Sequence, residues 1–378
     1  MNDTGWGLLK LRTTILMAVA AIVVLASASG WFISGKGIIS GFQELENRRA
    51  VEDTDRAERE IQIGASIGIC YSKDGTFDAS TMMIQSDTAM YRAKAEGKNG
   101  YCIFDSYMQD LALARLKLES GLRSALKNGE ISLVYQPLIN LQTNEIIGAE
   151  ALARWFHPLN GAISPAEFIP VAEETGEILA IGYWALEEAC MQTKKWLDEG
   201  CSPNFQMSVN VSGRQLQRTD VVERVAAILQ QTQLPAKNLK LEITESTLME
   251  DRQEIIEKMR QLKELGLQLA LDDFGTGYSS LSTLRLFPID TLKIDRAFIS
   301  RLGEEEGALA IVEAISAMAR SMKINVTGEG VETCAQRDII CSLGCTTGQG
   351  YFYDRPLSQA ELGERIKATG KASLKNAA

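Results

Sequence analysis

The sequence predicts an α/β protein whose larger part is a (β/α)8 barrel of the TIM type, preceded by a membrane-spanning helix and an incomplete α/β fragment. Eight short β-like runs follow one another across about 260 residues, and helical segments lie between most of them. Polar residues recur where these runs end, as they do at the mouth of a barrel. An open doubly wound sheet is the alternative, but it would need a glycine-rich nucleotide-binding turn after its first strand, and the sequence has none there.

The composition of the chain is that of a globular, acidic protein. Of its 378 residues, 45% are hydrophobic, and the formal net charge is -10. Nucleic-acid polymers are excluded as partners on this ground, because phosphate backbones are bound by clustered Lys and Arg. The seven cysteines form no CxxC pair, which favours reduced thiols over a zinc site. His157 is the sole histidine, so the chemistry must rely on carboxylates, amides, lysine and hard cations that prefer oxygen ligands.

The amino-terminal segment, residues 1–40, contains the predicted membrane-spanning helix. From Thr13 to Ser34 the chain is almost wholly apolar and carries no charge, which is long enough to cross a bilayer. A cleaved signal peptide is the alternative, since Lys10 and Arg12 precede the apolar run and Ala26–Ala28 fits a cleavage site. The apolar character continues past that site, which favours the membrane span.

Two further segments separate this helix from the barrel. Residues 41–60 are charged and helix-prone without a wide apolar stripe, which predicts a linker. Residues 61–105 form a fragment of an α/β domain, because Ile61–Cys70 alternates like a strand and Ala79–Lys94 has helical spacing.

The fragment resembles the carboxyl-terminal part of a GGDEF (diguanylate cyclase) domain through Ala65–Ile69, Asp87–Lys94 and Gly97–Asn99. The Gly-Gly-Asp/Glu-Glu-Phe signature that would hold GTP and metal is absent, as is the Arg-x-x-Asp inhibitory site upstream of it. The resemblance therefore does not imply cyclase activity, and the chain is expected to be a shortened version of a longer parent.

The barrel is predicted between residues 111 and 369, followed by a tail at 370–378. Leu118, Leu122 and Leu126 give a helical stripe before the first strand. The eight predicted strands lie near 132–135, 146–151, 206–211, 239–245, 268–272, 290–294, 324–328 and 347–351. The clearest predicted helices are Ile178–Leu197, Val221–Leu229, Arg252–Leu265 and Ala308–Met322.

Polar side chains stand at or near the ends of seven of these strands. They are Glu150, Asn210, Glu242, Asp272, Asp273, Lys293, Glu329 and Gln349. Taken singly, each could be a surface carboxylate or a helix cap. Acidic groups within apolar strands are costly to bury alone, so their convergence on one barrel mouth predicts bound cations.

The same residues resemble the EAL phosphodiesterase family over about 250 residues. The motifs, in chain order, are Glu150–Trp155, Ser164–Pro170, Glu173–Gly176, Ser208–Ser212, Glu242–Glu245, Asp272–Gly277, Lys293–Asp295, Gly328–Glu332 and Gln349–Tyr351. The resemblance implies hydrolysis of cyclic di-GMP to linear pGpG with two Mg²⁺ or Mn²⁺ ions, and a homodimer formed through the EAL domain. No catalytic position of the family is altered.

The resemblance also implies a role for each site residue. The implied metal ligands are Glu150, Asn210, Glu242, Asp272, Asp273, Glu329 and Gln349, with Asp272 shared between the two ions. The implied catalytic residues are Lys293, Glu329, Glu150 and Asp273, where Lys293 orients the attacking water or stabilises negative charge. The implied substrate contacts are Arg154, Gln136, Leu152 and Pro165.

Glu245 is implied to anchor the loop that starts at Phe274, whose glycines permit unusual backbone angles. Glu332 and His157 are expected to be structural. Independently of the resemblance, Arg154 is a candidate for phosphate binding, because its planar guanidinium suits a phosphate. A surface ion pair is the alternative.

Two other functions remain open. A module that binds cyclic di-GMP or a protein without turnover would be expected to lose metal ligands, and this chain keeps a full set. A shortened derivative with an intact site could also be inactive in the cell.

The predicted location is the bacterial inner membrane, crossed once, with the enzyme in the cytoplasm. Lys36, Arg48 and Arg49 on the enzyme's side of the span outnumber Lys10 and Arg12 on the other, which favours this orientation slightly.

Overall fold

The computed structural model describes residues 65–71, 78–95, 97, 99–249, 252–275 and 284–376. The predicted membrane span at Thr13 to Ser34 and the predicted linker at 41–60 lie outside these residues. Within the described ranges, no helix combines the length and the apolar character needed to cross a membrane. The chain divides into two compact units, Met1–Ala112 and Leu113–Ala378, each of which is described by itself.

The described part of the first unit contains two strands and a helix. Strands β1 (Ile67–Ile69) and β2 (Tyr101–Ile103) pair in parallel, and α3 (Ala79–Ala95) connects them. Gly68 lets the helix approach β1 closely, since a Cβ at this position would lie 1.9 Å from the carbonyl oxygen of Ser86. The predicted strand and helix of the fragment are therefore present as one parallel β-α-β crossover.

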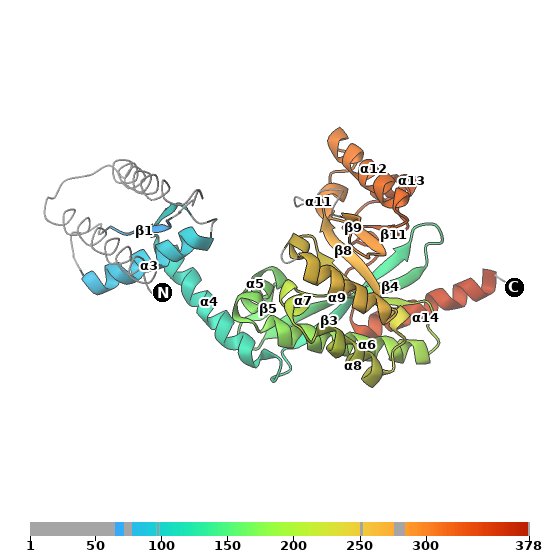
Figure 1. The fold of residues 1–378 in the computed structure, drawn as a ribbon, viewed down its shortest axis with the longest axis horizontal. Coiled ribbons are helices and arrows are strands. Elements are labelled where there is room, and N and C mark those ends of the chain that lie inside the picture. Colours follow the sequence, from blue (N-terminus) through green and yellow to red (C-terminus); the bar gives the residue numbers. More distant parts are fainter. Residues whose placement is uncertain are drawn as a thin grey trace, which may run out of the picture. The chain divides into compact units, whose positions relative to one another are not determined.

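Eight strands of the second unit close into a barrel in the order β3-β11-β10-β9-β8-β7-β6-β4, with β4 pairing back to β3 (Figure 1). Their bounds are β3 (Ile131–Asn140), β4 (Ile146–His157), β6 (Gln206–Asn210), β7 (Leu239–Thr244), β8 (Gln268–Phe274), β9 (Thr291–Ile294), β10 (Asn325–Gly328) and β11 (Thr347–Gly348). Each of the eight predicted strands has its counterpart here, so the predicted TIM-type barrel is confirmed.

The first barrel strand departs from a regular (β/α)8 pattern. Strand β3 runs antiparallel to both neighbours, β4 and β11. The connection from β3 to β4 is a short turn at 141–145, and a parallel pairing would have needed a crossover of a dozen residues or more. Strand β4 also extends beyond the barrel and pairs with the short β5 (Gly161–Ile163) as a hairpin.

Helices connect most of the other strands. Their bounds are α4 (Ser106–Ala125), α5 (Pro165–Thr175), α6 (Ile178–Asp198), α7 (Gly213–Gln217), α8 (Val221–Thr232), α9 (Arg252–Glu264), α11 (Arg296–Ile299), α12 (Glu306–Ser321), α13 (Cys334–Ser342) and α14 (Gln359–Asn376), with short 3-10 turns η1 (Ala236–Asn238) and η2 (Ser246–Met249). The four predicted long helices correspond to α6, α8, α9 and α12. Helix α14 continues past residue 369, where the barrel domain was expected to end.

Strand β7 shows how the sequence separates the core from the site. Leu239, Leu241 and Ile243 are buried in the cluster that also holds apolar residues of α8 and α9. Lys240 and Glu242 alternate with them and are also buried, so they face the barrel interior. The apolar side therefore holds the barrel in its helical shell, and the other side supplies charged groups to the interior.

A second apolar cluster supports the outer end of β4. Leu122 of α4, Trp155 of β4 and Phe168 of α5 pack in it, and Leu118 and Leu126 lie against it, as the predicted stripe requires. The cluster fixes the strand that carries Glu150 from the side remote from the barrel axis.

Candidate active site

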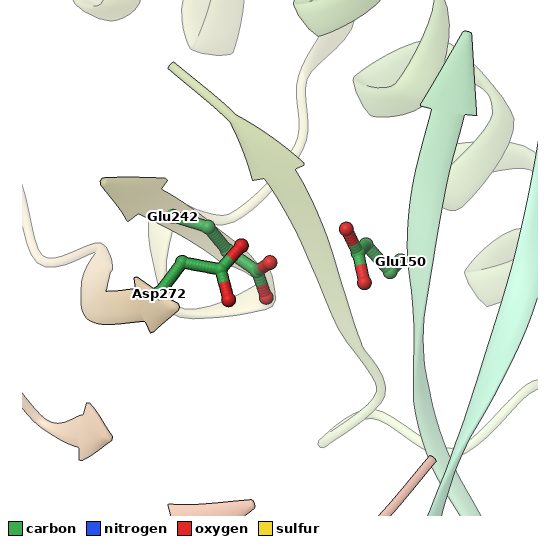
Figure 2. Close-up of side chains that lie close together, drawn as sticks. All are labelled: Glu150, Glu242 and Asp272. Atoms are coloured by element: carbon green, nitrogen blue, oxygen red, sulfur yellow. The ribbon is translucent and has the colours of Figure 1, made fainter. Parts of the chain in front are cut away.

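Three carboxylates on three strands converge inside the barrel. Glu150 of β4, Glu242 of β7 and Asp272 of β8 are buried, and one oxygen of each lies within 4.8 Å of the others. Figure 2 shows their carboxylates turned toward a common space. Neighbouring strand residues normally alternate, so these three come from the inward positions of their strands.

A second carboxylate group shares Asp272 with the first. It consists of Asp272, Asp273 and Glu329, again within 4.8 Å of one another. Consecutive strand residues should point to opposite sides, but the pairing of β8 with β9 shifts register between Leu271 and Phe274, and Asp273 has a left-handed φ of 54°. This bulge turns both aspartates toward the site.

Lys293 of β9 lies at the centre of the carboxylates with 2% of its side chain exposed. Its Nζ is 3.3 Å from Glu150 Oε2, 3.1 Å from Asp272 Oδ1 and 2.7 Å from Glu329 Oε1. It also donates a hydrogen bond to Glu242. One ammonium group therefore contacts carboxylates from both groups.

Side-chain amides hold Glu150 in place. Asn210 Nδ2 donates to Glu150 Oε1 at 2.7 Å, and Gln349 Nε2 donates to Glu150 Oε2 at 2.7 Å. Gln349 Nε2 also contacts Gln136 Oε1 at 3.1 Å. The buried Gln349 Oε1 has no hydrogen-bond partner among the described residues.

Burial and the crowding of negative charge both shift the pKa values of the carboxylates. Burial and the neighbouring Glu150 and Asp272 raise the pKa of Glu242 to about 8, against the opposing effect of Lys293. Burial, with Asp272 and Asp295 adding, raises the pKa of Asp273 to about 6. Burial likewise raises the pKa of Glu329 well above its ordinary value.

Lys293 and Glu150 respond differently. The surrounding carboxylates raise the pKa of Lys293 well above its ordinary value although burial opposes them. The pKa of Glu150 is lowered, because Lys293 and the two amide donors outweigh the burial of this carboxylate. Without cations, the site thus keeps Lys293 and Glu150 charged and favours protons on several other acids.

The residues present fit hard divalent cations. Mg²⁺ and Mn²⁺ take carboxylate and carbonyl oxygens, and both carboxylate groups supply such oxygens at mutual distances that one ion could bridge. The unpartnered Gln349 Oε1 is a further buried oxygen with unused acceptor capacity.

Glu245 lies just after β7 and reaches the loop that follows β8. Its side chain is buried, and Oε2 accepts a hydrogen bond of 3.0 Å from the backbone N–H of Gly275. Gly275 has a φ of 100°, which favours glycine. The contact is the one expected of a loop anchor, while the rest of that loop, 276–283, lies outside the described residues.

The structure also brings residues to the site that were not assigned to it from the sequence. The cleft at the barrel mouth is lined by Gln136 and Leu152 as expected, but also by Arg296, Glu332 and Tyr351. Arg296 and Glu332 form an ion pair of 2.7 Å. Each stands three residues after a predicted site residue, Lys293 or Glu329, and that spacing was the signal that could have found them.

Two predicted substrate contacts are not among the residues that line the cleft. Pro165 is the first residue of α5 and does not line the cleft. The half-buried Arg154 is also absent from the lining, and its guanidinium donates to the carbonyl oxygen of Ala153 at 2.8 Å. His157 accepts from the backbone N–H groups of Leu159 and Asn160, as suits a structural residue.

A closed β/α barrel with paired carboxylate groups around a lysine defines a metal-dependent barrel domain. The chain belongs to the EAL domain family, whose model matches residues 119–356. A second model, for the diguanylate cyclase GGDEF domain, matches residues 43–100. That match begins within the segment predicted to be a linker.

Two curated relatives align with most of this chain. The bifunctional diguanylate cyclase/cyclic di-GMP phosphodiesterase MucR of Pseudomonas aeruginosa is 42% identical over 307 residues, which are 81% of this chain and 44% of MucR. The cyclic di-GMP phosphodiesterase PdeR of Escherichia coli is 35% identical over 298 residues, 79% of this chain and 45% of PdeR. The chain thus spans less than half the length of these relatives.

Solved structures are similar over the barrel. The PaMucR phosphodiesterase in complex with c-di-GMP is 41% identical with a TM-score of 0.63, covering 65% of this chain and 99% of that one. The EAL domain of Mycobacterium smegmatis DcpA is 35% identical with a TM-score of 0.55, covering 64% of this chain and 97% of that one.

Proposed function

We propose that this chain hydrolyses cyclic di-GMP to linear pGpG with two divalent cations at the barrel mouth. The observation that carries the proposal is the pair of carboxylate groups that share Asp272. Family membership and the phosphodiesterase relatives support the same substrate. A phosphodiester is anionic and repels hydroxide, so its hydrolysis needs positive charge close to the reacting phosphorus.

The charges of the site agree with two ions. When fully ionised, the five carboxylates of Glu150, Glu242, Asp272, Asp273 and Glu329 carry five negative charges, and Lys293 carries one positive charge. Four negative charges are left over, which two divalent cations would balance. Burial, together with the neighbouring negative charges, raises the pKa values of Glu242, Asp273 and Glu329 when no cation is bound.

Each ion would have its own ligands. Glu150, Asn210 and Glu242 would hold the first ion, Asp273 and Glu329 the second, with Asp272 between them and Gln349 beside them. When bound there, two such ions would supply a hydroxide nucleophile at neutral pH and positive charge to balance the leaving oxygen.

Lys293 stabilises negative charge in this scheme. Its raised pKa keeps it protonated at neutral pH, so it does not take a proton from water. Its ammonium reaches both carboxylate groups and acts as a point charge beside the phosphate.

The remaining predicted contacts concern the substrate. Gln136 and Leu152 line the cleft and would touch the nucleotide directly. Arg154 and Pro165 would need to approach it with the substrate in place.

The test is to incubate the purified chain with cyclic di-GMP and separate the nucleotides. We expect pGpG with added Mg²⁺ or Mn²⁺, and inhibition by Ca²⁺, because the larger ion relaxes the tight octahedral geometry. Activity that survives exhaustive chelation contradicts the proposal. Rates measured with each ion alone decide between Mg²⁺ and Mn²⁺.

The second candidate is a binding module that holds cyclic di-GMP without cleaving it. The intact ligand set argues against it. Tight binding in the presence of Mg²⁺ or Mn²⁺, with no pGpG after prolonged incubation, would favour the module over the enzyme.

The chain further acts, in this proposal, as a homodimer in the bacterial inner membrane with the barrel in the cytoplasm. The apolar run at 13–34 and the count of flanking Lys and Arg support the location. Light scattering after size-exclusion chromatography tests the dimer. Alkaline phosphatase fused to the carboxyl terminus tests orientation, since a strong signal would place the barrel outside the cell.

A further inference from the structure

Two of the strand ends that carry predicted metal ligands are followed by the same local device. Asn210 is the last residue of β6, which a short loop connects to α7, and Glu329 lies in the loop that leads from β10 into α13. Each helix begins with a capping box, in which a hydroxyl at the N-cap and a glutamine three residues later satisfy each other's backbone N–H.

The first box ties Ser212 to Gln215. Ser212 Oγ accepts from the Gln215 N–H at 3.3 Å, and Gln215 Oε1 accepts from the Ser212 N–H at 3.1 Å. Gln215 is 2% exposed, and it fits against α6 only because Gly182 has no side chain, since a Cβ there would lie 2.3 Å from Gln215 Oε1.

The far end of α7 is held as well. The buried Lys258 of α9 donates to the carbonyl oxygens of Leu216 and Gln217 at 2.9 and 3.1 Å. The short helix is thus fixed at both ends, and the loop two residues after Asn210 has little freedom to move.

The second box ties Thr333 to Gln336. Thr333 Oγ1 accepts from the Gln336 N–H at 3.2 Å, and Gln336 Oε1 accepts from the N–H groups of Thr333 and Glu332 at 3.0 and 2.8 Å. Gln336 is 7% exposed. Its amide therefore holds the backbone three residues after Glu329.

We infer that Gln215 and Gln336 are positioning residues for the two cations, Gln215 through Asn210 and Gln336 through Glu329. The inference rests on the proposed function, because it assigns a role toward the ions of that site. Replacing an outer-shell partner that orients a ligand typically lowers metal affinity by about ten- to a hundredfold.

The test replaces each glutamine in the full chain and measures Mn²⁺ binding from the electron paramagnetic resonance signal of free Mn²⁺. Gln215→Met and Gln336→Met keep side-chain length but remove the acceptor, and each should weaken Mn²⁺ binding by on the order of tenfold. Gln215→Glu and Gln336→Glu retain the acceptor and should restore binding, because a capping box accepts either residue.

Kinetics give a second readout. At saturating Mn²⁺ the Met variants should recover most of the wild-type kcat, whereas at limiting Mn²⁺ they should lose activity. The double variant should lose more affinity than either single one, because the glutamines serve different carboxylate groups.

A matched control lies at the start of α14. Ser358 and Glu361 form the same reciprocal contacts, with the Ser358 N–H and hydroxyl donating to Glu361 Oε2 at 2.8 and 2.7 Å, and neither residue lines the cleft. Glu361→Met removes the same kind of capping contact at an exposed position and should leave Mn²⁺ affinity unchanged.

Unchanged affinity in both Met variants, or an equal loss in Glu361→Met, would overturn the inference while leaving the proposed function intact. If a Met variant fails to fold, Ser212→Ala or Thr333→Ala removes the other half of the box and gives the same comparison. A wild-type chain that binds no Mn²⁺ overturns the proposed function and the inference together.

Discussion

Asp272 occupies the position that both carboxylate groups share. It lies 3.1 Å from Lys293 Nζ, and its Oδ1 also accepts the N–H of Asp273 at 3.0 Å. A residue in this position would serve both ions, whereas Lys293 keeps three other carboxylate partners when Asp272 is replaced. Replacing Asp272 should therefore abolish activity without unfolding the barrel.

Asp272→Ala should abolish turnover of cyclic di-GMP without unfolding the barrel. Loss of the shared ligand removes several kcal/mol of transition-state stabilisation, so we expect a fall of at least about a thousandfold in kcat. The metal-free variant should melt at or above the wild-type temperature, because one of five crowded acids is gone. Glu150→Ala should lose activity as well. Turnover retained in both variants would remove the metal assignment.

Proton release should accompany cation binding. Glu242, with a pKa of about 8, holds a proton at pH 7 in the metal-free protein, and Asp273, with a pKa of about 6, holds one at lower pH. A cation must expel these protons, so Mn²⁺ affinity should rise with pH between 6 and 8, by up to about tenfold per unit for each proton expelled.

Calorimetry in two buffers of different ionisation enthalpy counts the protons released at pH 7. Glu242→Gln carries no titrating proton at this position and should release fewer than the wild type. Mn²⁺ affinity that does not change between pH 6 and pH 8 would contradict the raised pKa values.

The convergence of the carboxylates on one barrel mouth could be predicted from the sequence, because they stand at or near the ends of apolar strands. Lys293 contacts four of the carboxylates that were predicted beside it. Side-chain direction could not be predicted in the same way, since Arg154 turns to a backbone carbonyl. The Arg296–Glu332 pair also escaped prediction, because both residues are exposed and no apolar strand frames them.

Among the elements, β8 departs most from the regular pattern that the sequence predicts. Its apolar alternation indicates one inward aspartate, and the bulge that adds a second depends on the left-handed backbone at Asp273. The antiparallel β3 is a similar case, since strand runs alone do not reveal direction. The length of the β3–β4 turn was the signal available for it.

Two substitutions at Asp273 distinguish the effect of its backbone conformation from the effect of its charge. Asn tolerates a positive φ, so Asp273→Asn should keep wild-type stability and lose activity through the missing ligand. Asp273→Ala should lose activity and also about 1 kcal/mol of the free energy of unfolding, because a Cβ without a polar group is strained at this φ. Urea unfolding of the metal-free proteins measures the difference. Equal stability of the two variants would show that the backbone there is not constrained.

The two units of this chain differ in how many strands and helices their described residues form. The EAL model matches residues 119–356, and every one of its eight barrel strands is present. The GGDEF model matches residues 43–100, and the described residues of the first unit form two strands and a helix. The eight barrel strands could be predicted because the repeats of the barrel are regular, whereas a short fragment offers too few elements for its pairing to be predicted.

The chain should therefore degrade cyclic di-GMP but not make it. No Gly-Gly-Asp/Glu-Glu-Phe signature occurs in its 378 residues, so the turn that would hold GTP and its metal is missing. Any product would be consumed by the barrel, so the assay uses Asp272→Ala, incubated with GTP and Mg²⁺, and looks for both cyclic di-GMP and pGpG. The positive control is MucR, which is bifunctional by its name and is prepared in the same way. We expect neither nucleotide from this chain, and equilibrium dialysis should find no GTP bound to it. Either nucleotide formed above the level of a GTP-only blank would mean that residues 43–100 carry a cyclase site that does not need the signature.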